Sequence, residues 1–295
     1  MDKIIAFFMS IITMITSFFS SLFPFAEKNY DVFKNIAYGT EIREVMDIYI
    51  PDSAYEREEN GCILYIHGGS WTSGDKKDEA SKCIDMAEKG YITATMSYML
   101  FTEENASEYS ADVVLDEMNM ALQKIKDFCS EKGINITKAA TSGFSAGAHL
   151  SMLYSYSRAD SAPIKLAFTA NQVGPSDLSY DIWGDTGIYV AAALAGTEIT
   201  EEMIANGDTE KIIAAVSPVT YVNENSIPSL FAYGGKDTVV PKGNGESIKS
   251  AFEESGVKFD CILFPNSNHF LWSDPDCSEL YQKTLEDYCK SYFGY

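Results

Sequence analysis

The chain has 295 residues, 46% of them hydrophobic and 22% charged, as expected for one large globular domain or one domain with a small appendage. Its 43 acidic residues outnumber 22 basic ones, and the formal net charge of −21 lacks the basic footprint that nucleic-acid binding requires. We therefore expect no nucleic-acid partner. The six cysteines form no C-x-x-C pair and no cluster with histidine, which argues against a metal site. Cys62, Cys129 and Cys261 lie in apolar runs and are expected in the core.

The first 30 residues are distinct from the rest of the chain. Residues 4–26 carry no charge, and as a helix they would span ~34 Å, enough to cross a bilayer. Serines and threonines recur along them at spacings of three and four, which also suits a helix lying on a membrane or on its own domain. A cleaved signal peptide is a third interpretation. We expect a membrane anchor or an export signal here; a docked helix would instead indicate a cytoplasmic protein.

Residues 31–295 alternate between strand-like and helix-like segments. Two strands are predicted within 35–50, around Gly39, and the apolar run 61–66 has the length of a strand buried on both faces. The next predicted elements are a turn-rich segment at 67–75, a helix at about 77–89, a strand at 91–97 and a helix at about 110–126.

The second half continues this alternation after one interruption. A strand is predicted to lead into residue 143, a helix to follow over 148–154, and a further strand to run over 163–170. Residues 174–217 break the rhythm and are predicted to be an inserted helical lid. The last predicted elements are strands at 229–233 and 258–264, a helix ending near 254 and a closing helix from Ser278. The alternation predicts an α/β fold with a mostly parallel sheet covered by helices on both faces.

The pentapeptide Gly143–Gly147 reads G-F-S-A-G and lies between a predicted strand and a predicted helix. A serine at the tip of such a strained turn can be a nucleophile, and the nearly bare glycines on either side permit the sharp turn. Ser145 is the candidate nucleophile. The backbone N–H of Ala146 lies at the positive end of the following helix and is expected to point at the same substrate atom as the Ser145 hydroxyl.

A serine hydroxyl needs a base to accept its proton, and the chain contains three histidines. His67 precedes two glycines at a strand end, and His149 lies one turn into the helix behind the serine, so both are expected to be structural. His269 lies in a loop after a strand, where its imidazole can reach across to the serine. His269 is therefore the candidate base.

The base needs a carboxylate to fix its tautomer. Asp237 directly follows a strand and precedes His269. The resulting order Ser, Asp, His is the one that serine hydrolases with a parallel α/β sheet show. Asp177 also follows a strand and is the rival candidate. The loop 67–71 reads H-G-G-S-W, and its glycines let backbone N–H groups approach a substrate. Gly69 and Ser70, with Ala146, are the candidate oxyanion donors.

With these residues, the chain resembles the α/β-hydrolases, and within them the esterase and lipase group with an H-G-G oxyanion loop. Segments 67–76 and 143–150 are most similar to the bacterial acetyl-xylan and feruloyl esterase-like (BD-FAE-like) family; 215–218 and 237–241 also fit. The resemblance covers about 35–293 and implies an eight-stranded, mostly parallel sheet with a small helical lid. One departure is Met99, since many relatives carry an arginine after the tyrosine at this point.

The resemblance implies carboxylic-ester hydrolysis through an acyl-enzyme, without metal or cofactor. We expect short acyl groups on a small molecule or a polysaccharide, with acetyl or feruloyl groups on plant polysaccharide as candidates, because the lid is too short to wall a deep tunnel. One alternative is an amide hydrolase, a formamidase or small peptidase, with the same triad. A more remote one is a non-catalytic binding protein, although neither the serine nor the histidine is lost. The candidate pocket walls are Trp71, Tyr98, Trp183, Phe270 and Trp272.

Overall fold

The computed structural model describes residues 28–295, which build an eight-stranded sheet in the order β1-β2-β4-β3-β5-β6-β7-β8. β2 pairs antiparallel with both β1 and β4, and all the other neighbouring pairs are parallel. The predicted α/β class with a mostly parallel sheet is thus confirmed. The expectations for residues 1–26, including membrane association through 4–26, lie outside the described residues. Within 28–295, no helix has both the length and the apolar character needed to cross a bilayer.

The strands are β1 (Tyr30–Ala37), β2 (Val45–Pro51), β3 (Asn60–Ile66), β4 (Ile92–Met96), β5 (Ile136–Phe144), β6 (Lys165–Gln172), β7 (Ser229–Gly234) and β8 (Phe259–Phe264). Every residue of β3 is buried, as its unbroken apolar run predicts for a central strand covered on both faces. Cys62 and Cys129 are buried as predicted, but Cys261 is partly exposed. The physical reason is that Cys261 lies on β8, an edge strand of the sheet.

The α-helices are α2 (Ala80–Glu88), α3 (Ala111–Glu131), α4 (Ala146–Ser157), α5 (Tyr180–Trp183), α6 (Asp185–Leu194), α7 (Glu201–Asn206), α8 (Thr209–Val216), α9 (Gly243–Ser255) and α10 (Pro275–Phe293). α3 begins where the Ser110 hydroxyl accepts a hydrogen bond from the Val113 N–H, and it runs five residues beyond the predicted end. α10 begins at Pro275 rather than Ser278, because proline is favoured at the first helical position.

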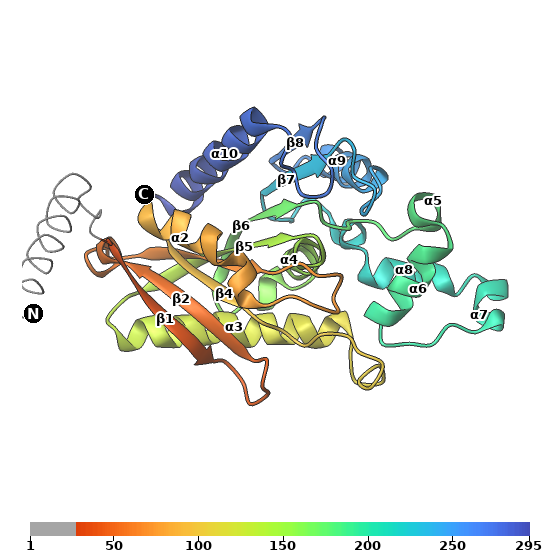
Figure 1. Cartoon of the computed structure of the whole chain (residues 1–295), viewed down its shortest axis with the longest axis horizontal. Coiled ribbons are helices and arrows are strands. Elements are labelled where there is room, and N and C mark those ends of the chain that lie inside the picture. Colours follow the sequence, from red (N-terminus) through yellow and green to blue (C-terminus); the bar gives the residue numbers. More distant parts are fainter. Residues whose placement is uncertain (1–27) are drawn as a thin grey trace, which may run out of the picture.

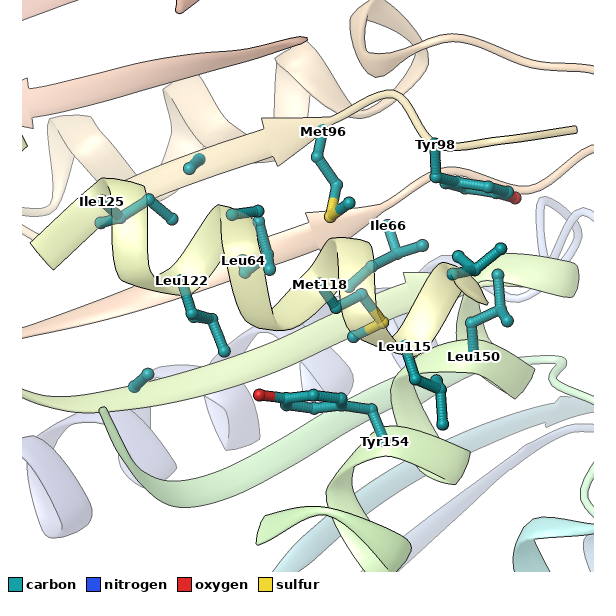
Figure 2. Packing of buried hydrophobic residues seen from close by; sticks show 14 of the residues in the cluster. Leu64, Ile66, Met96, Tyr98, Leu115, Met118, Leu122, Ile125, Leu150 and Tyr154 are labelled. Atoms are coloured by element: carbon teal, nitrogen blue, oxygen red, sulfur yellow. The ribbon is translucent and has the colours of Figure 1, made fainter. Parts of the chain in front are cut away.

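Helices cover both faces of the sheet (Figure 1). α2 and α10 pack on one face, against side chains such as Ile63, Tyr65 and Phe168. α3 and α4 cover the other face, where Leu115, Met118, Leu122 and Ile125 of α3 and Leu150 and Tyr154 of α4 meet Leu64 and Ile66 of β3 (Figure 2). α9 packs on this second face, beside α4 and β7. The sheet and the helix layers on its two faces fix where each strand ends, and therefore where each loop begins.

Between β6 and β7 the chain departs from the strand–helix alternation. Helices α5–α8 and a short 3₁₀ turn, η4 (Pro218–Tyr221), fill this connection. The four helices lie together at one end of the molecule (Figure 1). The indole N–H of Trp183 donates to the Asp177 carbonyl at 2.8 Å, and the Leu178 N–H donates to the Ser217 hydroxyl at 3.0 Å. The first bond closes the start of the insertion, and the second ties its first and last parts together.

Candidate active site

Four loops carry the candidate residues, and each follows a strand. His67 follows β3, Ser145 follows β5, Asp237 lies three residues after β7, and His269 lies in the loop after β8. These four strands are mutually parallel. Their carboxyl ends therefore meet along one edge of the sheet, which is where ligands bind in open α/β sheets.

The turn at Ser145 has a backbone conformation that non-glycine residues rarely adopt. Its φ is 55° and its ψ is −120°, and α4 begins at the next residue, Ala146. A Cβ on Gly143 would clash with the backbone of Gly147, and a Cβ on Gly147 would clash with the Ile66 carbonyl. Close backbone approach therefore requires glycine at both positions, and the strained turn places the serine hydroxyl at the edge of the sheet, beside the cavity.

The structure brings Ser145, His269 and Asp237 into one hydrogen-bonded series. The imidazole Nε2 of His269 lies 2.9 Å from the Ser145 hydroxyl oxygen, and its Nδ1 lies 2.8 Å from the Asp237 Oδ2. Because a carboxylate accepts only, Nδ1 carries the proton and Nε2 is free to accept the serine proton. All three side chains are largely shielded from water. This arrangement can activate a serine for attack on a carbonyl carbon.

Backbone groups hold the acid in place. The second oxygen of Asp237 accepts from the N–H groups of Val239 (2.8 Å) and Val240 (3.0 Å). The rival carboxylate, Asp177, instead accepts from the Ser247 hydroxyl at 2.6 Å and from the Ser179 N–H at 2.9 Å. Asp177 thus shapes a turn in the insertion and makes no contact with His269.

A second carboxylate shapes the histidine loop. Asp274 accepts from the N–H and the side-chain amide of Asn266, both at 2.9 Å, and from the Ser267 hydroxyl at 2.7 Å. Burial alone would raise the pKa of Asp274, but these hydrogen bonds together outweigh it, and the pKa is lowered. The loop that carries His269 is therefore closed on itself before α10 begins. The sequence reasoning missed Asp274, although a carboxylate just before a proline-initiated helix is a recognisable signal.

The imidazole rings of the other two histidines make no hydrogen bond to Ser145, and both are buried in the protein. His67 donates from Nδ1 to the Gly68 carbonyl at 2.7 Å, and its ring stacks on Tyr98. Burial lowers the pKa of His67, and it lowers the pKa of His149 to about 4. Both rings therefore favour the neutral form.

The loop after β3 is tightly wound. Gly69 has a φ of 119°, and the next two residues, Ser70 and Trp71, have φ values of 52° and 62°. The Gly69 carbonyl accepts from the N–H groups of Thr72 (3.1 Å) and Ser73 (3.0 Å), which closes the turn. Among residues 28–295, no acceptor is paired with the N–H of Gly69, Ser70 or Ala146. Free N–H groups beside a nucleophile can stabilise an oxyanion.

Arg43, from the β1–β2 connection, braces this loop from behind. Its guanidinium donates to the Tyr98 carbonyl at 2.6 Å and to the Gly74 carbonyl at 2.9 Å. It also lies 3.5 Å from the unprotonated Nε2 of His67. The sequence reasoning missed Arg43, because a contact between positions 43 and 74 leaves no local pattern in the chain.

A cavity of about 380 Å³ opens beside Ser145. Its walls are almost entirely apolar and come from the oxyanion loop, the 99–110 connection, the acid loop and α6 of the insertion. Trp71 and Trp183 both line it, as proposed for pocket walls, together with residues that the sequence reasoning missed: Phe101, Tyr109, Tyr189, Leu194, Val239 and Val240. An apolar group of a substrate fits such walls.

The other three candidate wall residues, Tyr98, Phe270 and Trp272, lie outside the cavity lining. Tyr98 is fully buried, and its hydroxyl donates to the His67 carbonyl at 2.8 Å, so it supports the loop and does not reach the cavity. Phe270 is 50% exposed and also lies outside the cavity lining. Its ring stacks between Phe144 (centroids 6.2 Å apart) and Trp272 (4.8 Å), and Trp272 is 79% exposed. We call these three stacked rings beside His269 the aromatic ledge.

Comparison with known proteins finds one matching family model and relatives that are named as esterases. The BD-FAE family model matches residues 46–252. Esterase LipQ of Mycobacterium tuberculosis is 25% identical over 246 residues, which are 80% of this chain and 56% of that protein. Isoprenylcysteine alpha-carbonyl methylesterase ICME of Arabidopsis thaliana is 23% identical over 251 residues, again 80% of this chain and 56% of the relative. The chain thus spans little more than half the length of these relatives.

Solved structures share the fold of this chain. A truncated form of a carbohydrate esterase from gut microbiota superposes with a TM-score of 0.71 at 17% identity, over 90% of this chain and 99% of that one. Esterase B from Lactobacillus rhamnosis superposes with a TM-score of 0.69 at 14% identity, over 97% of this chain and 94% of that one. Because the identities are so low, these similarities show the α/β-hydrolase fold and nothing about the reaction.

Proposed function

The chain belongs to the BD-FAE family, an α/β-hydrolase esterase family, and on that premise we propose that it is a serine carboxylic-ester hydrolase acting on short-chain acyl esters. The observation that carries the proposal is the series from Asp237 through His269 to Ser145, with contacts of 2.8 and 2.9 Å. Each contact has the length and the polarity that nucleophilic catalysis requires.

The reaction follows from the positions of these atoms. The Ser145 oxygen attacks the ester carbonyl carbon while its proton passes to His269 Nε2, and the carbonyl π electrons move to the oxygen. The N–H groups of Gly69, Ser70 and Ala146 stabilise that oxyanion. When the intermediate collapses, the C–O bond to the alcohol breaks and His269 protonates the leaving oxygen. Water then repeats the cycle on the acyl-enzyme and releases the acid.

The surroundings of Ser145 give the substrate an orientation. The leaving oxygen must face His269, which supplies its proton, so the alcohol extends toward the aromatic ledge of Phe144, Phe270 and Trp272. The acyl group extends the other way, into the apolar cavity. A cavity of about 380 Å³ accommodates acetyl to butyryl chains.

We assign the alcohol part of the ester, on the ledge side, to a sugar residue, as in acetylated or feruloylated plant polysaccharide. Exposed aromatic faces such as that of Trp272 bind the apolar face of a ring, and one protein of similar fold is a carbohydrate esterase.

The test compares ester with amide substrates on the full chain. We expect rapid hydrolysis of p-nitrophenyl acetate and release of acetate from acetylated xylan, with much slower cleavage of N-formylkynurenine and dipeptide anilides. The Ser145→Ala variant, which keeps the fold, should lose all of these activities. Faster amide than ester cleavage would make the protein an amide hydrolase instead. No hydrolysis of any substrate would refute catalysis.

A further inference from the structure

His149 joins a wall residue of the acyl cavity to the helical insertion. The indole N–H of Trp71, on the oxyanion loop, donates to His149 Nδ1 at 3.3 Å, and the two rings are perpendicular with centroids 5.3 Å apart. On its other side, His149 Nε2 donates to the Val216 carbonyl at 2.7 Å. Since that carbonyl can only accept, the proton is on Nε2 and the lone pair on Nδ1 faces the indole. Both ring nitrogens are therefore used.

The two partners of His149 belong to different parts of the site. Trp71 lines the cavity and follows Ser70, a candidate oxyanion donor. Val216 is the last residue of α8, so its carbonyl belongs to the helical insertion. His149 itself is fully buried on α4, one turn behind the nucleophile. One side chain on the rigid nucleophile helix thus connects the oxyanion loop to the insertion.

The Trp71 backbone needs such an anchor. Its φ of 62° is unusual for a residue with a bulky side chain and persists only when neighbouring contacts hold it. The Trp71 carbonyl accepts from the Phe101 N–H at 2.8 Å, which fixes the backbone on one side. Among the described residues, the indole N–H has His149 as its one hydrogen-bond partner, which fixes the side chain on the other.

We propose that His149 is a positioning residue that holds the Trp71 indole in the cavity wall, and thereby sets both the acyl-chain preference and the alignment of the oxyanion loop. This deepens the proposed esterase function and rests on it for its kinetic consequence. The hydrogen bond itself is a separate claim about the folded protein. The two are therefore tested by separate readouts.

The first readout does not depend on activity. The chain has three tryptophans, so a nitrogen-15 spectrum of the full-length protein contains three indole N–H signals, and Trp71→Phe identifies one of them. We expect His149→Leu to shift the Trp71 signal upfield, and His149→Gln, which retains a donor and an acceptor, to shift it less. The matched control is Ser155→Ala, which removes a buried hydrogen bond to Thr141 from the same helix and should leave the signal in place. An unmoved Trp71 signal in His149→Leu would overturn the proposal.

The second readout is the ratio of kcat/KM for hexanoyl and acetyl p-nitrophenyl esters. His149→Leu removes the hydrogen bond to Trp71 and should leave this wall of the cavity mobile. The ratio should therefore rise about fivefold, and kcat for the acetyl ester should fall. Trp71→Phe should raise the ratio similarly, and the double variant should add nothing further, because both changes break one contact.

Equal loss on every chain length, with a lower Tm in both His149→Leu and Ser155→Ala, would show a merely structural role and overturn the proposal. If the wild type hydrolyses no ester at all while the Trp71 signal still moves in His149→Leu, the proposed function fails and the positioning of Trp71 by His149 stands.

Discussion

The Nε2 of His269 lies 2.9 Å from the hydroxyl oxygen of Ser145, although 124 positions separate the two residues in the chain. Only the sheet brings them together, because β5 and β8 end at the same edge with β6 and β7 between them. Asp237, after β7, completes the series at 2.8 Å from the imidazole. Three predictions test what this arrangement does, and a fourth tests the stability of the fold.

The first prediction concerns the acid. In Asp237→Asn, the carboxylate that fixes the imidazole tautomer is lost, so kcat for p-nitrophenyl acetate should fall by about 10³–10⁴ with little change in KM. The matched control is Asp177→Asn, which removes a carboxylate bonded to Ser247 and should change kcat by less than about threefold. A comparable loss in both variants would mean that the acid is misassigned. Steady-state kinetics on both proteins decide the matter.

The second prediction concerns the acyl cavity. Ala193, on α6, contributes to its wall, and a phenylalanine there would fill part of the 380 Å³. We expect Ala193→Phe to lower kcat/KM for butyryl esters about tenfold relative to acetyl esters, because the longer chain meets the new ring. Ala193→Ser, a small change at the same position, should leave the ratio unaltered. An unchanged ratio in Ala193→Phe would place the acyl group elsewhere.

The third prediction concerns the aromatic ledge. Trp272 is 79% exposed and stacks on Phe270 at 4.8 Å, so Trp272→Ala removes the outer ring without opening the core. Loss of one stacking contact should raise KM for acetylated xylo-oligosaccharides about fivefold and leave p-nitrophenyl acetate unaffected. The control is Tyr55→Ala, which removes an exposed ring from the turn before β3. This turn lies at the amino end of β3, whereas the candidate site lies at its carboxyl end. Equal kinetics of wild type and Trp272→Ala on the oligosaccharide would remove the ledge from the substrate site.

The fourth prediction concerns pH and stability. Glu117 is buried on α3, and burial raises its pKa to about 7; Glu44 adds to the rise, while the Met99 N–H and Arg43 oppose it. A raised pKa means that the folded protein prefers the protonated form. The stability that this proton contributes is complete below the ordinary glutamate pKa and is lost as the pH rises through 7.

Glu117→Gln keeps a neutral acceptor at every pH. It should therefore exceed the wild type in free energy of unfolding by up to ~3 kcal/mol at pH 8, with the gap closing as the pH falls toward 5. Denaturant titrations at both pH values measure this. Glu131→Gln, an exposed change on the same helix, should have the same small effect at both. A Glu117→Gln variant that is less stable than the wild type at pH 8 would contradict the prediction.

Much of the fold could be predicted from local patterns. The apolar run of β3 and the regular strand–helix alternation determine a parallel sheet, because no other layer arrangement covers such strands on both faces. Helix ends were less predictable: α3 continues to Glu131 because packing and not propensity decides where a long amphipathic helix stops.

The candidate site divides in a similar way. Ser145 could be chosen from its G-x-S-x-G turn, His269 because the chain has only three histidines, and Asp237 from the order Ser, Asp, His. The structure places the three in contact; their catalytic roles stay predictions. The cavity walls could not be chosen. Tyr98 and Phe101 lie three positions apart in one connection, yet Tyr98 is buried under the oxyanion loop and Phe101 lines the cavity. Tertiary packing alone decides which aromatic ring meets a substrate.

The most direct test of the central claim is covalent labelling of Ser145. A fluorophosphonate reacts with a serine only where a neighbouring base activates it, so intact mass spectrometry of the labelled protein reports the proposed contact with His269. We predict one adduct per chain on the peptide that contains Ser145, none in Ser145→Ala, and strongly slowed labelling in His269→Ala. A protein that hydrolyses esters but carries its adduct on another residue, or that labels equally in Ser145→Ala, would contradict the account.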